Sequence, residues 1–249
     1  MTAAGGPAYR RVADALREGI RNGELAPGSR LASLPKLGQE FDVSPDVARQ
    51  ALAVLRAEGL VETRQGAGAF VRAFAQITRR APDRLARERW VGGEAIQDAD
   101  TGPRWRTVDI TVNEIPAPAA VAVALDLSEG EPVVARSRRF LVDERPVQLA
   151  TSYFPADLVR GTAIAYTDTG PGGSYARLAE LGHEPVRFRE RVEDRLPDSA
   201  ERSTLALPAD GSRIFEVTRL AFTADGRCVE VNRMVLDAAV YVLEYEFSA

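Results

Sequence analysis

Three short helical patterns follow one another near the start of the chain, and they constrain its fold more than any other feature. In the first, apolar residues recur at helical spacing over residues 9–20. Residues 34–41 and 44–57 repeat this periodicity in two further stretches. Ser33 and Ser44 stand where a helix needs an N-cap, because a serine side chain can accept a hydrogen bond from a free first-turn N–H group. The sequence therefore predicts three consecutive helices.

Two short strand patterns follow the third helix, at residues 60–64 and 69–72. They are joined by Gln65-Gly66-Ala67-Gly68, and a tip rich in glycine lets the backbone lie close to phosphate or enter a minor groove. Three helices and a hairpin in this order are typical of a winged helix-turn-helix, which places one helix in the major groove of DNA. The order predicts a DNA-binding regulator in which helix 44–57 is the recognition helix.

The same region resembles the GntR family of bacterial transcription regulators. The resemblance rests on LASLPKLGQEFDVSPDVARQAL, AEGLV and RQGAGAFV, which follow the family pattern in the same order. The chain has Pro35 and Pro45 where the family usually carries DNA-contacting arginines, and Arg49 matches the third recurrent arginine. The helical periodicity and the resemblance together give these candidate DNA-binding residues: Ser33, Lys36, Ser44, Asp46, Arg49, Gln50, Arg64, Gly66 and Gly68.

Length, charge and cysteine content limit the class of protein. A chain of 249 residues with 45% apolar content fits two domains. Residues 1–72 carry ten basic and eight acidic side chains and the rest carries 22 and 28, so the basic excess lies in the proposed DNA module. The single cysteine, Cys228, excludes an internal disulfide and is expected in the core. We expect a soluble, cytoplasmic protein with no membrane partner, because no signal peptide or long apolar run occurs.

Residues 73–104 are expected to be a linker between the two domains. This stretch is rich in arginine and contains a polar, turn-forming part at 98–103, which is typical of a solvated connector. Trp90 is too apolar to be left in water, so we expect it to dock on one of the domains.

From Trp105 onward the apolar residues alternate with a period of two, which indicates strands rather than helices. The predicted strands are 105–113, 132–142, 146–154, 184–196, 212–223, 227–236 and 241–247, and the predicted helices are 118–125, 155–159, 174–181 and 200–207. Antiparallel hairpins with a few interposed helices predict an α+β domain over residues 105–249.

Three phrases in this part, EGEPVVARSRRFLVDERPVQLATSYFP, GGSYARLAELGHEP and DGRCVEVNRMVL, resemble the effector-binding UTRA domain of the HutC subgroup. That domain shares the fold of chorismate lyase. The resemblance implies an α+β protein with a winged helix-turn-helix domain and a chorismate-lyase-like antiparallel domain that binds an effector and dimerises. By position, the recurrent arginine, hydroxyl, aromatic and glutamate of the family correspond to Arg138, Ser152, Tyr153 and Glu230.

Arg138 shares one face of its predicted strand with Arg136 and Phe140. An inward guanidinium needs an anion, and its planar fork suits a carboxylate or a phosphate. The anion is either a bound metabolite or an internal carboxylate from Glu190 or Glu230, and both alternatives remain open. Tyr175 either closes the pocket or fills the core. The candidate effector-binding residues are Arg138, Ser152, Tyr153, Tyr175, Glu190 and Glu230.

Signatures of catalysis and of metal binding are absent from the sequence. The only histidine, His183, follows a helix-ending glycine and is expected at the surface, and no Cys/His cluster suits zinc. Neither a Walker A motif nor GxGxxG after a strand occurs. We expect no enzyme and no cofactor, but a homodimeric repressor that binds a double-stranded DNA operator and a small anionic effector. Two alternatives remain: a lyase-like enzyme fused to a DNA module, and a partner-binding protein with a decayed DNA module.

Overall fold

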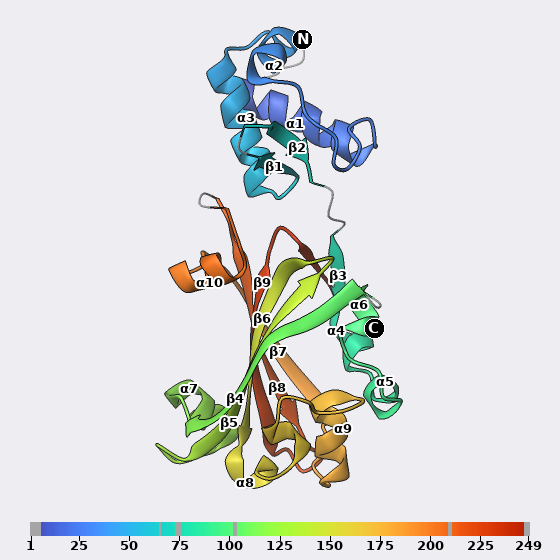
Figure 1. Cartoon of the computed structure of the whole chain (residues 1–249), viewed down its shortest axis with the longest axis vertical. Coiled ribbons are helices and arrows are strands. Elements are labelled where there is room, and N and C mark those ends of the chain that lie inside the picture. The colour runs from blue at the N-terminus through green and yellow to red at the C-terminus, as the bar shows by residue number, and fades with distance from the viewer. Residues whose placement is uncertain (1–5, 65, 73–75, 102–103, 209–210, 247–249) are drawn as a thin grey trace. The chain divides into compact units, whose positions relative to one another are not determined.

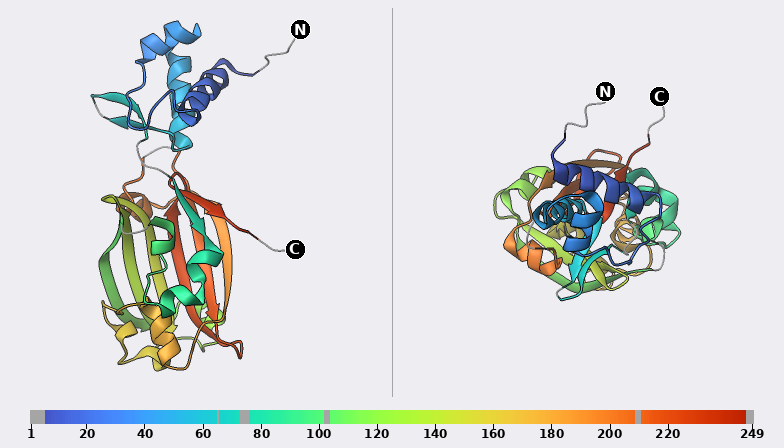
Figure 2. Two further views of the ribbon diagram at one scale, coloured as in Figure 1. Left: turned by 90° about the vertical axis from the view of Figure 1, so that its right-hand side faces the viewer. Right: turned by 90° about the horizontal axis from the view of Figure 1, so that it is seen from above.

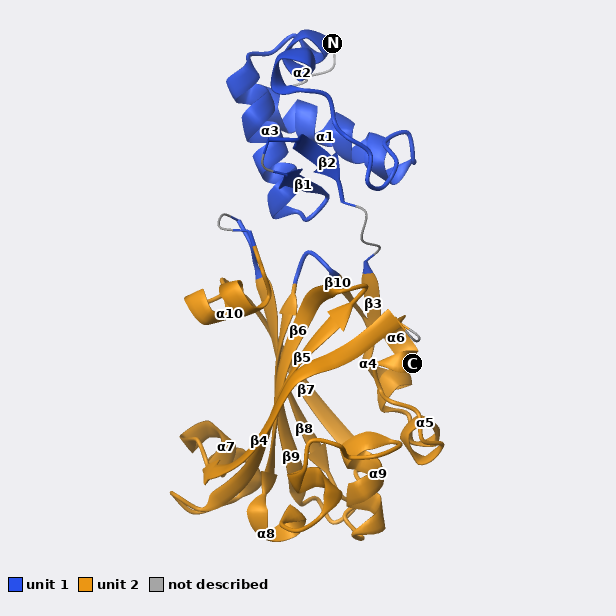
Figure 3. Ribbon diagram, in the orientation of Figure 1, with its two compact units in different colours: residues 1–76, 208–213, 238–240 blue, residues 77–207, 214–237, 241–249 orange. Residues whose placement is uncertain are grey.

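The computed structural model describes residues 6–64, 66–72, 76–101, 104–208 and 211–246. The chain forms two compact units, coloured separately in Figure 3. Unit 1 contains residues 1–76 with 208–213 and 238–240, and unit 2 contains the rest of the chain. Each unit is described by itself.

Unit 1 contains the three predicted helices and the predicted hairpin (Figure 1). The helices are α1 (Ala8–Arg21), α2 (Leu34–Phe41) and α3 (Pro45–Ala57), followed by β1 (Val61–Arg64) and β2 (Gly68–Val71). The two strands pair antiparallel. The apolar stripes of the helices meet in one core, which confirms the predicted helical faces.

The two serines at helix starts behave differently. The Ser44 side chain accepts a hydrogen bond from the backbone N–H of Val47 at 3.3 Å, as predicted for the cap of α3. Ser33 occupies the N-cap position of α2, but its side chain makes no capping hydrogen bond, contrary to expectation. Pro35 lies in the first turn of α2, so this turn has one backbone donor fewer to satisfy.

Unit 2 is built on one antiparallel sheet with the strand order β4-β5-β6-β9-β8-β7. The strands are β4 (Trp105–Pro116), β5 (Pro132–Val142), β6 (Arg145–Pro155), β7 (Arg187–Arg195), β8 (Ile214–Phe222) and β9 (Cys228–Asp237). The helices between them are α7 (Ala119–Leu125), α8 (Ala156–Val159), the 3-10 turn η2 (Ala163–Ala165), α9 (Gly173–Glu180) and α10 (Ser199–Thr204). This arrangement confirms the predicted α+β class.

Apolar side chains on the two faces of the sheet belong to different cores. Val134 and Ala221 pack with Trp90 and Tyr175, whereas their neighbours Val133 and Leu220 pack with residues of α7. Successive side chains of a strand point to opposite faces, so one core lies on each side of the sheet. Cys228 lies in the core with Val133 and Leu220, as expected, and burial raises the pKa of its thiol to about 11.

The segment 77–101 differs from the solvated connector expected from its composition. It forms β3 (Ile77–Arg80), α4 (Ala81–Leu85), α5 (Arg87–Val91) and α6 (Asp98–Thr101), and it belongs to unit 2. β3 pairs in parallel with β10 (Tyr241–Glu244), and the helices cross one face of the large sheet (Figure 2). Trp90 is buried in that face, which confirms that it docks on a domain.

Candidate DNA interface and ligand pocket

The candidate DNA-contacting side chains of unit 1 all lie on its surface. Ser33, Lys36, Ser44, Asp46, Arg49, Gln50, Arg64, Gly66 and Gly68 are exposed. The Arg49 side chain is 64% exposed and pairs with Asp46 one turn earlier on α3. Such an exposed pair contributes little stability, so Arg49 can exchange its carboxylate for a phosphate or a base at low cost.

The hairpin tip has the backbone that its glycines predict. Gly66 and Gly68 have φ angles of +72° and +103°, in the region that favours glycine. No atom lies within 4 Å of the position that a Cβ of Gly66 would occupy, so the backbone there is open to a partner. Arg64 lies over the ring of Phe70 at 4.4 Å, which holds a positive charge beside the tip.

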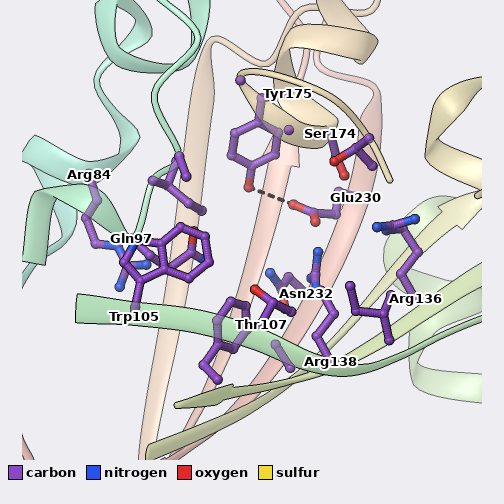
Figure 4. Close-up of a pocket in the computed structure, with 18 of the residues that line it drawn as sticks. Arg84, Gln97, Trp105, Thr107, Arg136, Arg138, Ser174, Tyr175, Glu230 and Asn232 are labelled. Atoms are coloured by element: carbon purple, nitrogen blue, oxygen red, sulfur yellow. Dashed lines mark hydrogen bonds between the residues drawn. The ribbon is translucent and has the colours of Figure 1, made fainter. Parts of the chain in front are cut away.

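Unit 2 contains a cavity of about 330 Å³ on the face of the sheet that also carries Trp90. Its walls come from the sheet, from the segment 77–101, and from the loop 167–173, which runs into α9 (Figure 4). This volume lies within the range of small-molecule sites. The wall contains four arginines, Arg84, Arg136, Arg138 and Arg219, which is an unusual number of cations for one cavity.

Strand register explains why polar side chains gather here. Arg136 of β5 lies opposite Ser152 of β6, Ser152 opposite Asn232 of β9, and Asn232 opposite Arg219 of β8. Residues opposite one another in an antiparallel sheet share a face. One polar row therefore crosses four strands, and it is buried because the segment 77–101 and α9 cover this face.

Arg136 and Arg138 are bound by neutral groups. Arg136 Nη1 donates to the carbonyl oxygen of Ile164 at 2.9 Å, and its Nη2 donates to that of Thr167 at 3.2 Å. Arg138 Nη2 donates to Ser152 Oγ at 2.6 Å. Burial, with Arg138 nearby, lowers the pKa of Arg136 to about 10, and burial also lowers that of Arg138. Among the described residues neither guanidinium forms an ion pair with a carboxylate.

Tyr175 and Glu230 join two walls of the cavity. The Tyr175 hydroxyl donates a hydrogen bond to Glu230 Oε2 at 2.6 Å (Figure 4). Burial raises the pKa of Tyr175 well above its usual value, so the phenol stays protonated and keeps donating. The Tyr175 ring packs edge-on against Trp90, with ring centres 6.1 Å apart.

Three residues expected at the pocket lie elsewhere. Tyr153 is the neighbour of Ser152 on β6, so it points to the opposite face and packs beside α7. Ser152 is fully buried behind Arg138 and does not line the cavity. Glu190 binds Arg79 through two hydrogen bonds, so the internal ion pair considered for Arg138 is formed by Arg79 instead.

Several wall residues were not foreseen from the sequence. Arg84 and Gln97 belong to the segment that was expected to be a solvated linker. Arg219 and Asn232 lie in apolar strands, and only the register brings them beside Arg136. Arg136 itself carried a usable signal, since it shares the strand face of Arg138.

Comparison with known families assigns both units. The family model of the UTRA domain matches residues 101–241, and that of the bacterial regulatory proteins of the gntR family matches residues 8–71. The chain belongs to the GntR family. It is a DNA-binding transcription regulator with a winged helix-turn-helix domain and a UTRA domain, which confirms the fold and the function class expected from the sequence.

Similar proteins cover both parts of this GntR regulator. An HTH-type transcriptional regulator of Streptomyces coelicolor is 32% identical over 97% of this chain and 93% of its own length. A solved structure assigned to the GntR family is 29% identical, with a TM-score of 0.65 over 98% of both chains. The C-terminal domain of a histidine utilization repressor from Pseudomonas syringae, 20% identical, has the same fold, with a TM-score of 0.51 over 59% of this chain and 100% of that domain.

The described residues of this GntR regulator include no group of three or more His, Cys, Asp or Glu side chains placed to hold a metal ion. No helix in the described part of the chain is long and apolar enough to cross a membrane.

Proposed function

We propose that this regulator is a repressor that leaves its operator when an anionic metabolite binds in the unit 2 cavity. The observation that carries the proposal is the pair Arg136 and Arg138, which line the cavity and are held by carbonyl and hydroxyl groups rather than by carboxylates. A buried cation without an anion is costly, and a carboxylate or phosphate of a ligand would remove that cost.

Repression is supported by relatives with assigned roles. A repressor of the mannosyl-D-glycerate transport and metabolism system of Escherichia coli is 44% identical over 66 residues, which cover 26% of this chain. That match supports repression as the mode of action. The class of effector is inferred from the residues of the cavity instead. The proposed contacts are Arg136, Arg138, Tyr175 and Glu230, and Ser152 is proposed to orient Arg138.

On DNA, we propose that α3 enters the major groove and that the tip at Gly66 and Gly68 follows the minor groove. Arg49 and Arg64 are the cations best placed for contact, since both are exposed on these elements. An operator with two half-sites needs two DNA-binding domains, so the proposed active form is a homodimer joined through unit 2. We propose a domain boundary near residue 76, and the membership of β3 and the helices after it in unit 2 supports this boundary.

The side chains of the cavity suit binding better than catalysis. The titratable residues that line the cavity are four arginines with Asp168, Tyr175 and Glu230. Cations of this number suit the binding of an anion, and the relatives named above are transcriptional regulators or repressors.

Selection of genomic fragments by the purified full chain would provide the operator. Candidate carboxylates and phosphorylated compounds are then added to the complex, and operator affinity is measured by fluorescence anisotropy. The proposal expects at least one anion to weaken binding by about 5-fold to 150-fold, and Arg136→Gln to remove this response. A regulator that selects DNA but ignores every anion would contradict the effector part of the proposal.

A further inference from the structure

The buried charges around the cavity form two groups. The first, called the sheet group, consists of Arg136, Arg138 and Glu230. Arg136 and Glu230 are each 2% exposed, and all three side chains line the cavity. Glu230 accepts its hydrogen bond from the hydroxyl of Tyr175 and not from a guanidinium group. Two cations and one carboxylate leave this group with one positive charge in excess.

The second group, called the segment group, consists of Arg79, Arg84, Asp100, Glu190 and Arg219. Arg84 Nη1 lies 2.9 Å from Asp100, and Arg79 is bound by Glu190. Arg219 Nη1 lies 3.9 Å from Glu190, which is already engaged by Arg79. The three arginines are at most 1% exposed. Three cations and two carboxylates again leave one positive charge in excess.

Several guanidinium groups at the cavity also lack hydrogen-bond partners. Nε of Arg84, Nε and Nη1 of Arg219, and Nε of Arg136 and of Arg138 are buried without a hydrogen-bond acceptor among the described residues, whereas Arg84 Nη1 has Asp100 at 2.9 Å. Burial, together with the charges of Arg79 and Arg219, lowers the pKa of Arg84 to about 10. Cationic N–H donors that have lost water and gained no acceptor are the groups that an anionic ligand satisfies best.

Arg84 of the segment group and Arg136 of the sheet group lie at different ends of the cavity, whereas Arg219 lies opposite Asn232 in the sheet. Figure 4 shows Arg84 on one side and Arg136 on the other, with Glu230 and Asn232 between them. Asp168 also lies at the cavity, but it is exposed, and it accepts a hydrogen bond from the backbone of Gly170, so water screens its charge. A single anionic group placed at Arg136 would leave the excess charge of the segment group uncompensated.

We infer that the ligand of this cavity carries two separated anionic groups, one bound by Arg136 and Arg138 and the other by Arg84 and Arg219. This inference rests on the proposed function and makes it specific: a metabolite with one anionic group would satisfy only half of the cavity. Arg84 is then a specificity-determining residue, supplied by the segment 77–101. Asp100 limits the strength of the second subsite, because it already shares Arg84.

The test is calorimetric titration of the full chain with linear dicarboxylates (glutarate, adipate, pimelate and suberate) and with monocarboxylates of the same lengths. In the wild type, the dicarboxylate whose length fits should bind about 10-fold tighter than its monocarboxylate. Arg84→Gln should remove this advantage and leave monocarboxylate binding unchanged. Asp100→Asn should enlarge the advantage, because Arg84 then has no competing carboxylate. Because Asp100→Asn is expected to change the dicarboxylate advantage in the opposite direction, the inference can still be tested if Arg84→Gln does not fold.

Arg104→Gln is the matched control, since Arg104 is 47% exposed, pairs with Asp143 at 3.1 Å and does not line the cavity. The inference is overturned if mono- and dicarboxylates bind equally, if Arg84→Gln weakens both alike, or if no dicarboxylate binds. If the inference is overturned but monocarboxylates still bind the wild type and not Arg136→Gln, the proposed anionic effector stands and only the second subsite is rejected. The absence of binding by any of these anions would count against both.

Discussion

At the scale of single residues, the consequence of burying an arginine depends on its partner. Arg79 is fully buried and held by two hydrogen bonds to Glu190. Arg138 is partly buried and held by Ser152, a neutral group. A cation with a buried carboxylate is part of the fold, whereas a cation with a neutral partner is available to a ligand. Substitution of the two residues by the same side chain should therefore have different results.

Arg79→Met should lower the free energy of unfolding by about 3 kcal/mol, because it leaves the carboxylate of Glu190 buried without its main partner. Burial alone would raise the pKa of Glu190, but the hydrogen bond and charge of Arg79 outweigh it, so the pKa lies below its usual value. This stability is present above the pKa of an unfolded glutamate and is lost as the pH falls through the folded value. Urea denaturation should show a difference from wild type that shrinks in acid; a constant difference would argue against the assignment.

Arg138→Met should leave the melting temperature of the ligand-free protein unchanged or raise it, because no carboxylate loses a hydrogen-bond donor and a desolvated cation is removed. The same variant should lose the stabilisation that an anionic ligand gives to the wild type. Differential scanning calorimetry with and without ligand measures both effects. A large fall in the ligand-free melting temperature would mean that Arg138 is a structural residue and not a ligand contact.

At the scale of elements, the loop 167–173 is fixed to the segment 77–101 by a close backbone approach. Gly172 has a φ of +75°, and a Cβ at this position would lie 2.1 Å from the carbonyl oxygen of Trp90. The N–H of Gly172 donates to the carbonyl of Gly93 at 3.1 Å. The wall of the cavity is thereby tied to the segment that supplies Arg84.

Gly172→Ala should destabilise the protein strongly, by about 3 kcal/mol or more, because the clash adds to the cost of a left-handed backbone. Gly173→Ala is the matched control: its φ is +65°, but no atom lies within 4 Å of its Cβ position. The control should lose only about 1 kcal/mol. Thermal melting of the two variants distinguishes them, and equal losses would mean that the contact with Trp90 does not constrain the loop.

Local patterns predicted most elements of the fold, and non-local pairing accounts for the differences. Strand 132–142 has the predicted bounds, and the bounds of α2 and of the hairpin differ by at most one residue, because helix caps, glycines and alternation act within a few residues. β3 was missed because its partner β10 lies at the other end of the chain. A charged composition concealed how fully Ile77 and Trp90 are buried.

In the candidate site too, local patterns were predictable and contacts between distant strands were not. Arg138, Tyr175 and Glu230 were predicted and line the cavity, whereas Arg84, Arg219 and Asn232 were not predicted. The sequence indicates which residues of one strand share a face, but not which strands are neighbours. Tyr153 was wrongly expected at the pocket because the resemblance matched it together with Ser152, and alternation places these two side chains on opposite faces.

At the scale of the whole molecule, the proposed binding to two half-sites requires two protomers for each operator. We expect the full chain, and a fragment that begins at residue 76, to sediment as dimers at micromolar concentration. A fragment that begins at residue 105 should misfold or aggregate, because it lacks β3 and the buried Trp90. Analytical ultracentrifugation of the three proteins gives the answer, and a monomeric full chain would contradict the proposed dimer.

In the proposed function, one chain reads DNA with unit 1 and senses an anion with unit 2. The most direct measurement is operator affinity by fluorescence anisotropy, with and without the anion, for wild type, Arg49→Ala and Arg136→Gln. Arg49→Ala should lose about 1–3 kcal/mol of operator binding and still be stabilised by the anion. Arg136→Gln should bind the operator like wild type and no longer respond to the anion. Operator affinity unchanged in Arg49→Ala, or a full anion response in Arg136→Gln, would contradict the claim.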